Sequence, residues 1–314
     1  MAGVRRKIRW FWWPALLLAG TLLAEVAPPF FHRGRIVPLE GGGWADEDAL
    51  RTARETVSHA TDTPMWTNPT GFGKDVFTFA RIKFYSETTT MIYQGHGGSL
   101  SWWVDYPDAD LNLSYRLQQL TTIRTDPDGR VLFLTDPDLT DFPFIYMSHP
   151  ENMVLDPDEI MALRRYLDNG GFLVMIDLWN NEGWRKFAAQ MAQVLPGRAW
   201  TELDTTHPLF RMVYNLEGPM ENLRMPTLQF WNKKHLDGDR STPLQTVNRG
   251  PGSDEMHVRA LHDDKGRMMV LAVHNSDISD GWEREGENQQ YFEKFSEKRA
   301  YPFGINLMIY LLTH

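Results

Sequence analysis

Apolar positions along residues 77–312 follow strand-like and helix-like periods in alternation. FTFARIKFY (77–85) has the two-residue period of a strand, and VLFLTD (131–136), FPFIYMSH (142–149) and FLVMID (172–177) are short apolar runs typical of buried strands. Helical spacing covers residues 108–123, 156–171 and 180–197. Strands and helices that alternate with short connections predict a doubly wound, mostly parallel α/β sheet.

The helix at 156–171 carries the clearest end signals. Asp156 is the expected N-cap, Pro157 takes the first position, Glu159 closes a capping box, and Gly170 follows the last turn. Residues 200–250 are predicted to form long loops. MHVRALHDDKGRMMVLAVHN (256–275) predicts a hairpin, and the chain from Gln289 to the end predicts helix.

The N-terminus has the pattern of a membrane segment. Arg5, Arg6, Lys7 and Arg9 precede WFWWPALLLAGTLLA, an uncharged run of 15 residues. This run is shorter than the ~20 residues of a full span, and a cleaved secretory signal is the alternative. The flanking positions offer poor cleavage sites, which favours a retained anchor over residues 1–31 with Trp10, Trp12 and Trp13 at the interface.

The expected topology follows from the basic cluster. Positive charge stays inside, so the N-terminus is predicted to be cytoplasmic and the main domain periplasmic, on a single-pass protein of the bacterial inner membrane that contacts lipid through residues 8–31. Residues 32–75 are rich in Pro and Gly and are predicted to form a linker with a short helix at 44–60. The α/β domain is then predicted to cover residues 76–314.

Charge and composition exclude several classes of protein. The N-terminal basic residues contribute +4 to a net charge of −9, so the remainder carries −13 and has no basic footprint for nucleic acid. Cysteine is absent, which excludes disulfides, thiolate nucleophiles and Cys-ligated zinc. No Walker or nucleophile-elbow motif occurs.

Ser148, His207 and Asp177 would be the catalytic residues of an alternative function, that of a hydrolase or carbohydrate-active domain. Ser148 and Asp177 end predicted strands, and His207 would supply the base. The neighbouring His149 points to the opposite face of an extended chain from Ser148. The favoured interpretation has no catalytic site, and Asp177 instead caps the helix that starts at Asn180.

No metal or cofactor is predicted. Asp177, His149, His207 and Asp280 have suitable ligand types, but they lack tight spacing. The loop NSDISDGWERE (275–285) is rich in oxygen ligands without the register of a calcium loop, and GHGG (95–98) does not open a helix. Candidate binding residues are Trp102, Trp103, Asp105 and Trp179, which could stack on a sugar or a partner, or pack in the core.

Seven stretches taken in order resemble the bacterial domain of unknown function (DUF) 4159 family. They are FTFARIKFYS, WWVDYPDADLNLSYRLQQLTTI, DFPFIYMSHP, LDPDEIMALRRYLDNGGFLVMID, HPLFRMVYNL, NSDISDGWE and YPFGINLMIYLL. The resemblance implies a flavodoxin-like sheet related to class I glutamine amidotransferases, on exported or membrane-attached proteins. Leu178 stands where members often carry a second acidic residue, and a chain without cysteine cannot perform amidotransferase chemistry.

The sequence therefore predicts a membrane-anchored periplasmic domain that acts by binding. The expected role is an accessory or scaffold subunit of a complex with an integral-membrane partner. This expectation rests on the acidic, aromatic-rich body and the Trp-rich N-terminal segment.

Overall fold

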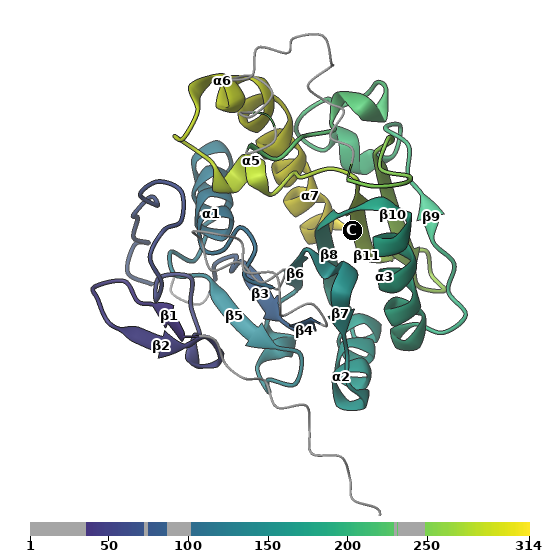
Figure 1. The fold of residues 1–314 in the computed structure, drawn as a ribbon, viewed down its shortest axis with the longest axis horizontal. Helices are drawn as coiled ribbons and strands as arrows, with labels where there is room; N and C mark the ends of the chain where they lie inside the picture. Colours follow the sequence, from purple (N-terminus) through teal and green to yellow (C-terminus); the bar gives the residue numbers. More distant parts are fainter. Residues whose placement is uncertain (1–35, 72–74, 87–101, 229–230, 232–248) are drawn as a thin grey trace, which may run out of the picture. The chain divides into compact units, whose positions relative to one another are not determined.

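A computed structural model of the chain describes residues 36–71, 75–86, 102–228, 231 and 249–314. Its central sheet has seven strands in the order β5-β3-β6-β8-β11-β10-β9 (Figure 1). These are β5 (Arg130–Phe133), β3 (Ala80–Lys83), β6 (Phe144–Ser148), β8 (Phe172–Leu178), β11 (Met268–His274), β10 (His257–His262) and β9 (Thr201–Glu202). The mixed α/β architecture with a mostly parallel sheet is confirmed.

The first five strands in this order are parallel, and β10 and β9 extend the sheet in antiparallel pairing. Numbered by their occurrence in the chain, the parallel strands run 2-1-3-4-5. The order reverses between β3 and β6, and in open α/β sheets ligands bind outside the carboxyl ends of the strands at such a switch point.

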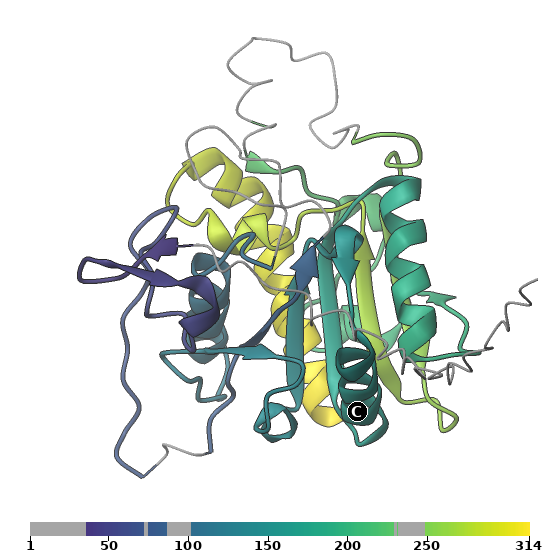
Figure 2. The same ribbon diagram turned by 60° about the horizontal axis from the view of Figure 1, so that its bottom comes forward.

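Helices cover both faces of the sheet (Figures 1 and 2). α1 (Asp108–Leu120) and α7 (Tyr301–Thr313) pack on one face, whereas α2 (Pro157–Asp168) and α3 (Asn180–Val194) pack on the other. Alternate residues of one strand enter the two cores: Tyr146 of β6 faces α1 and α7, and Met147 faces α2 and α3. Burial on both faces explains why these strands are continuously apolar.

The predicted end signals of α2 are confirmed. The Asp156 carboxylate accepts the N–H of Glu159 at 2.9 Å, and the Glu159 carboxylate accepts the N–H of Asp156 at 2.9 Å. Gly170 has a φ of 106°, as a residue just past a helix end requires.

The prediction of a helix at 44–60 is wrong. Residues 36–46 form a hairpin of β1 (Ile36–Pro38) and β2 (Trp44–Asp46), followed by the 3-10 turn η1 (Glu47–Ala49). The alanine-based stripe was too weakly apolar to hold a helix against the sheet. Leu50 and Trp66 enter the core on one face of the sheet, so the described part of the predicted linker packs on the domain.

Shorter elements complete the chain. They are β4 (Tyr85–Ser86), paired with β7 (Met153–Val154); the 3-10 turns η2 (Leu139–Asp141), η3 (Pro150–Asn152), η4 (Pro208–Arg211) and η5 (Met220–Asn222); α5 (Asp280–Glu283); α6 (Gln289–Tyr291); and the π-helix η6 (Phe292–Ala300). Within the described ranges, no helix is long and apolar enough to cross a membrane. The predicted anchor with Trp10, Trp12 and Trp13, and the GHGG loop, lie outside those ranges.

Candidate functional site

Left-handed backbone conformations gather at the carboxyl edge of the sheet. Five described residues other than glycine have positive φ: Asp105, His149, Asp177, Asn180 and Asn275. Asp105 precedes α1 and His149 follows β6. Asp177 lies at the end of β8, Asn180 is the first residue of α3, and Asn275 follows β11. Such conformations cost roughly 1–3 kcal/mol each and cluster at active and ligand-binding sites. Their common location marks this edge as the candidate site.

Three buried carboxylates meet at this edge. Asp105, Asp277 and Asp280 are 6%, 2% and 2% exposed, and one oxygen of each lies within 4.8 Å of those of the other two. Ser148 donates its hydroxyl hydrogen to Asp105 at 3.2 Å. Carboxylates this close, and this far from water, repel one another unless they bind protons or a cation.

The charged forms of Asp277, Asp280 and the adjacent Asp177 are disfavoured. Burial, together with the charges of Asp177, Asp280 and Asp105, raises the pKa of Asp277 well above its ordinary value. Burial also raises the pKa of Asp280, and it raises that of the adjacent Asp177 to about 6. The positive groups nearby therefore do not neutralise the cluster.

Those positive groups lie on its flanks. The Arg249 guanidinium lies 3.3 Å from Asp177 and 3.9 Å from Asp277, and it stacks over the Trp179 ring at 4.2 Å. Arg284 pairs with Asp280 at 3.3 Å and with the buried Glu283 at 2.7 Å. Arg284 also pairs with Glu287 at 2.8 Å, so Arg249 is shared between two carboxylates and Arg284 among three.

His149 forms a separate ion pair beside the cluster. Its Nδ1 lies 2.7 Å from the Glu151 carboxylate. Burial opposes protonation of the ring, but the charges of Glu151 and Asp177 raise the pKa of His149 to about 9. The imidazolium therefore interacts electrostatically with Glu151 and Asp177. It is not paired with Ser148, which donates to Asp105 instead.

The Tyr146 hydroxyl adds a buried polar atom without a well-placed partner. The residue is 0% exposed, and its hydroxyl lies near the Ser148 and Ser279 side chains, which lower its pKa without a hydrogen bond of good geometry among the described residues. Burial raises the pKa of Tyr146, and the Asp105 charge raises it further, which places this hydroxyl near the acidic cluster. An unsatisfied buried hydroxyl costs roughly 1–3 kcal/mol, and a bound ion or water is a common explanation.

Two anchors hold the carboxylates in place. Arg81 is fully buried, pairs with Asp110, and donates to the carbonyls of Trp102 and Val104 at 2.9 and 2.8 Å, just before Asp105. Asn275 donates its N–H to the carbonyl of Leu178 at 2.7 Å, which joins the loop carrying Asp277 and Asp280 to β8.

A second cluster lies beside the first. His59, Asp108 and Glu283 each offer an atom within 4.8 Å of the others. Burial raises the pKa of Asp108 to about 6, although Ser58 and the His59 N–H, at 2.8 Å, donate to its carboxylate. The Asp108 carboxylate is thus bound by these donors, and the Asp280 carboxylate of the first cluster likewise accepts from the Leu228 N–H and, at 3.2 Å, from the Tyr291 hydroxyl.

The structure does not assemble the predicted Ser148, His207 and Asp177 triad. Ser148 and Asp177 lie at the carboxyl edge, but the His207 ring packs on Tyr310 near the end of α7 and lies close to His262, the last residue of β10. That end of β10 is the opposite edge of the parallel sheet, because β10 runs antiparallel to β11.

The prediction that Asp177 caps α3 is also wrong. The Asn180 carboxamide accepts the N–H groups of Glu182 and Gly183 at 3.0 Å, while Asp177 binds the Trp179 indole N–H and Arg249. A left-handed φ at Asp177 and Asn180 turns the chain so that Asn180 reaches the helix N-terminus instead.

The predicted binding residues divide into two kinds. Trp102, Trp103 and Trp179 are 3%, 6% and 2% exposed, so they pack in the core and present no open stacking face. Asp105 lies in the carboxylate cluster. The sequence interpretation missed Asp277 and treated Asp280 as a ligand only with Asp177 and histidines. The sequence signal for these two residues was the acidic loop at 275–285. Without knowledge that this loop lies near Asp105, its acidic residues are indistinguishable from residues that cap turns.

The fold and the edge define the class of protein: an open α/β domain with an acidic, buried site at the switch point of its sheet. The sequence model of the family described as "Domain of unknown function (DUF4159)" matches residues 88–312. The chain belongs to this family, and six of the seven motifs lie within the matched residues. No curated protein matches the chain.

Proposed function

We propose that the domain binds a divalent cation at its carboxyl edge through Asp105, Asp277 and Asp280, and that its role is cation-dependent binding. The observation that carries this proposal is the approach of three buried carboxylate oxygens to within 4.8 Å of one another. A divalent cation would neutralise the charge that Arg249 and Arg284 leave uncompensated, and the Tyr146 hydroxyl supplies a further oxygen nearby.

The donor set favours calcium over magnesium. All the side chains offer oxygen, which suits hard cations and not zinc or copper. Calcium takes roughly six to eight oxygens in flexible geometry, whereas magnesium keeps several waters and seldom enters an all-protein cage. At most 6% exposure leaves little access for such waters at these three carboxylates.

The position of the cation fits a flavodoxin-like classification of the fold, which we propose from the strand order. Flavodoxin-like sheets run 2-1-3-4-5 and bind their ligand at the switch point between strands 1 and 3. Here β3 and β6 flank that point, and β6 ends at Ser148, the hydroxyl that donates to Asp105.

Calcium binding to the full-length protein in nonionic detergent tests the proposal. Isothermal titration is expected to show one Ca²⁺ site, tighter than the site for Mg²⁺, and Asp105→Asn is expected to weaken Ca²⁺ at least 100-fold. Asparagine tolerates the left-handed φ of 64° at this position, so the variant changes charge and not backbone. Asp62→Asn, at an exposed aspartate, is the matched control.

Two results would contradict the cation site. One is the absence of a Ca²⁺ isotherm for the wild-type protein at millimolar concentration. The other is equal weakening in Asp62→Asn and Asp105→Asn, which would indicate general attraction by an acidic surface.

We further propose that the domain works at a bacterial inner membrane as an accessory subunit, with residues 8–31 as its anchor. The basic cluster followed by 15 uncharged residues supports this role. The protein is expected to stay in the membrane fraction after carbonate extraction, with an intact N-terminus by mass spectrometry. Release of a mature form that starts near residue 22 would contradict the anchor.

A further inference from the structure

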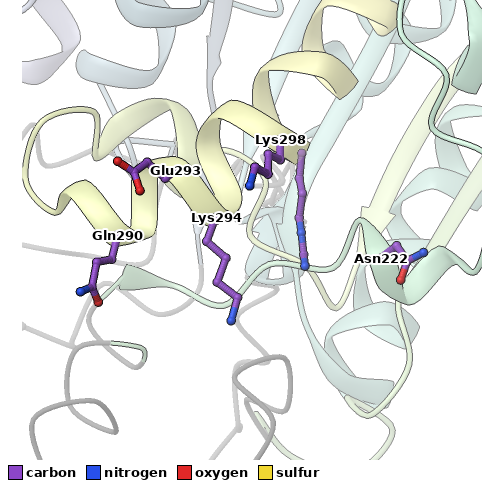
Figure 3. Close-up of a pocket in the computed structure, with 6 residues that line it drawn as sticks. Asn222, Gln290, Glu293, Lys294 and Lys298 are labelled. Carbon is purple, nitrogen blue, oxygen red and sulfur yellow. The ribbon is translucent and has the colours of Figure 1, made fainter.

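A groove of about 450 Å³ on the described surface is positively charged, although the chain as a whole carries −9. Its lining consists of Asn222, Gln290, Glu293, Lys294, Lys298 and Arg299. Five of these residues come from α6 and the π-helix η6, and Figure 3 shows Lys294 and Gln290 extending from that helical segment. The groove is shallow, open to solvent and lined by polar side chains, with room for a small polar ligand.

The π-helix explains why the cations share one side. Its hydrogen bonds join residues five apart, so Lys294 and Arg299 stack on consecutive turns. In an α-helix, with about 3.6 residues per turn, the same two positions would point in different directions. Lys298 precedes Arg299 in the chain and also lines the groove.

None of these three cations forms an ion pair with a carboxylate of the described residues. The charge of Arg299 adds to burial in lowering the pKa of Lys294, and burial lowers the pKa of the half-buried Arg299. Glu293 accepts a hydrogen bond from Gln289 at 2.7 Å, so its carboxylate is engaged by the preceding turn. The cations therefore repel one another, with no carboxylate of the described chain paired between them.

We propose that this groove binds the phosphate group of a small, soluble phosphate monoester. Its three cations and one carboxylate give a net charge of +2, which matches the charge of roughly −1.5 to −2 on a monoester at neutral pH. The amides of Asn222 and Gln290 add neutral donors for the phosphate oxygens. The groove is too small for a macromolecular surface, and this proposal is independent of the carboxylate site.

The test uses the full-length protein in nonionic detergent, titrated with inorganic phosphate and with glucose 6-phosphate as probes. The described structure shows no hydrogen bond from Lys294 or Lys298, and Lys294 makes one cation–π contact, with Phe295 at 5.5 Å, so Lys294→Gln with Lys298→Gln removes charge at little cost to the fold. Arg299 is left in place because it donates to the carbonyl of Arg224 at 2.5 Å. Lys265→Gln, in the exposed turn of the β10–β11 hairpin, is the matched control.

Glucose 6-phosphate is expected to bind more tightly than inorganic phosphate, and the double variant is expected to weaken both at least tenfold. Lys265→Gln should leave both affinities unchanged. Equal affinities in the wild-type and double-variant proteins would overturn the proposal. So would tighter binding of soluble dihexanoyl phosphatidylglycerol than of glucose 6-phosphate, because it would assign the groove to a lipid headgroup.

Discussion

Arg81→Ala is expected to lower the free energy of unfolding by about 3–5 kcal/mol, the cost of leaving one partner of a buried ion pair alone. Arg81 and Asp110 are 0% and 1% exposed, and the Arg81 guanidinium also satisfies the carbonyls of Trp102 and Val104. Alanine would leave the Asp110 charge and both carbonyls without these donors. Urea denaturation followed by tryptophan fluorescence measures the loss.

A double variant separates charge burial from packing. Arg81→Met with Asp110→Leu removes both charges and keeps apolar volume, so it is expected to recover part of the stability that Arg81→Ala loses, while the carbonyls of Trp102 and Val104 still lack their donor. It should still bind Ca²⁺ more weakly, because nothing then holds the carbonyl of Val104, the residue before Asp105. A loss below about 1 kcal/mol in Arg81→Ala, far under the range for a broken buried pair, would show that the pair does not support the fold.

Most of the fold could be predicted because its signals are local. The capping box of Asp156 and Glu159 and the apolar run of β8 each occupy a few consecutive residues, and each specifies its element without knowledge of the rest. The prediction for residues 36–71 was wrong because the structure of this segment is not set by local signals. Its structure depends on docking: Lys83 of β3 donates to the carbonyls of Asp48 and Leu50 at 2.9 Å.

The site could be predicted only in part because it depends on long-range geometry. Asp105 and Asp277 are separated in sequence by most strands of the sheet, and they meet because left-handed residues at Asp105 and Asn275 turn both chain segments inward. Sequence patterns place Ser148 and Asp177 at strand ends, which correctly locates the edge. Sequence patterns do not show that His207 lies at the opposite edge of the sheet.

Asp277→Asn is expected to raise the stability of the metal-free protein at pH 8, on the order of 1–3 kcal/mol, the range for a poorly satisfied buried polar group. The carboxylate of Asp277 is 2% exposed and faces Asp105, Asp177 and Asp280. Its Oδ1 accepts the N–H of Asp280 at 3.1 Å, a bond that asparagine keeps. The variant therefore removes the repulsion and, with it, the weaker attraction of Arg249, which lies 3.9 Å away.

The pH dependence gives the same substitution a second readout. A carboxyl group whose pKa is raised by folding stabilises the protein fully below its unfolded pKa, and that contribution is lost as pH rises through the folded value. For Asp177 this window runs from about 4 to about 6, and for Asp277 it extends higher. The metal-free wild type should thus lose stability between pH 4 and pH 8, and Asp277→Asn should lose less.

Calcium should reverse the ranking of the two proteins. It binds the ionised carboxylates, so 5 mM Ca²⁺, roughly 100 times a dissociation constant of 50 μM, would stabilise the wild type by about 2.7 kcal/mol at pH 8. Asp277→Asn should show almost none of this gain. Thermal unfolding of both proteins at pH 5 and pH 8, with Ca²⁺ or with EDTA, measures their stability under all four conditions. If Asp277→Asn is less stable than the wild type in EDTA at pH 8, the carboxylates are a structural network and not a strained, cation-binding site.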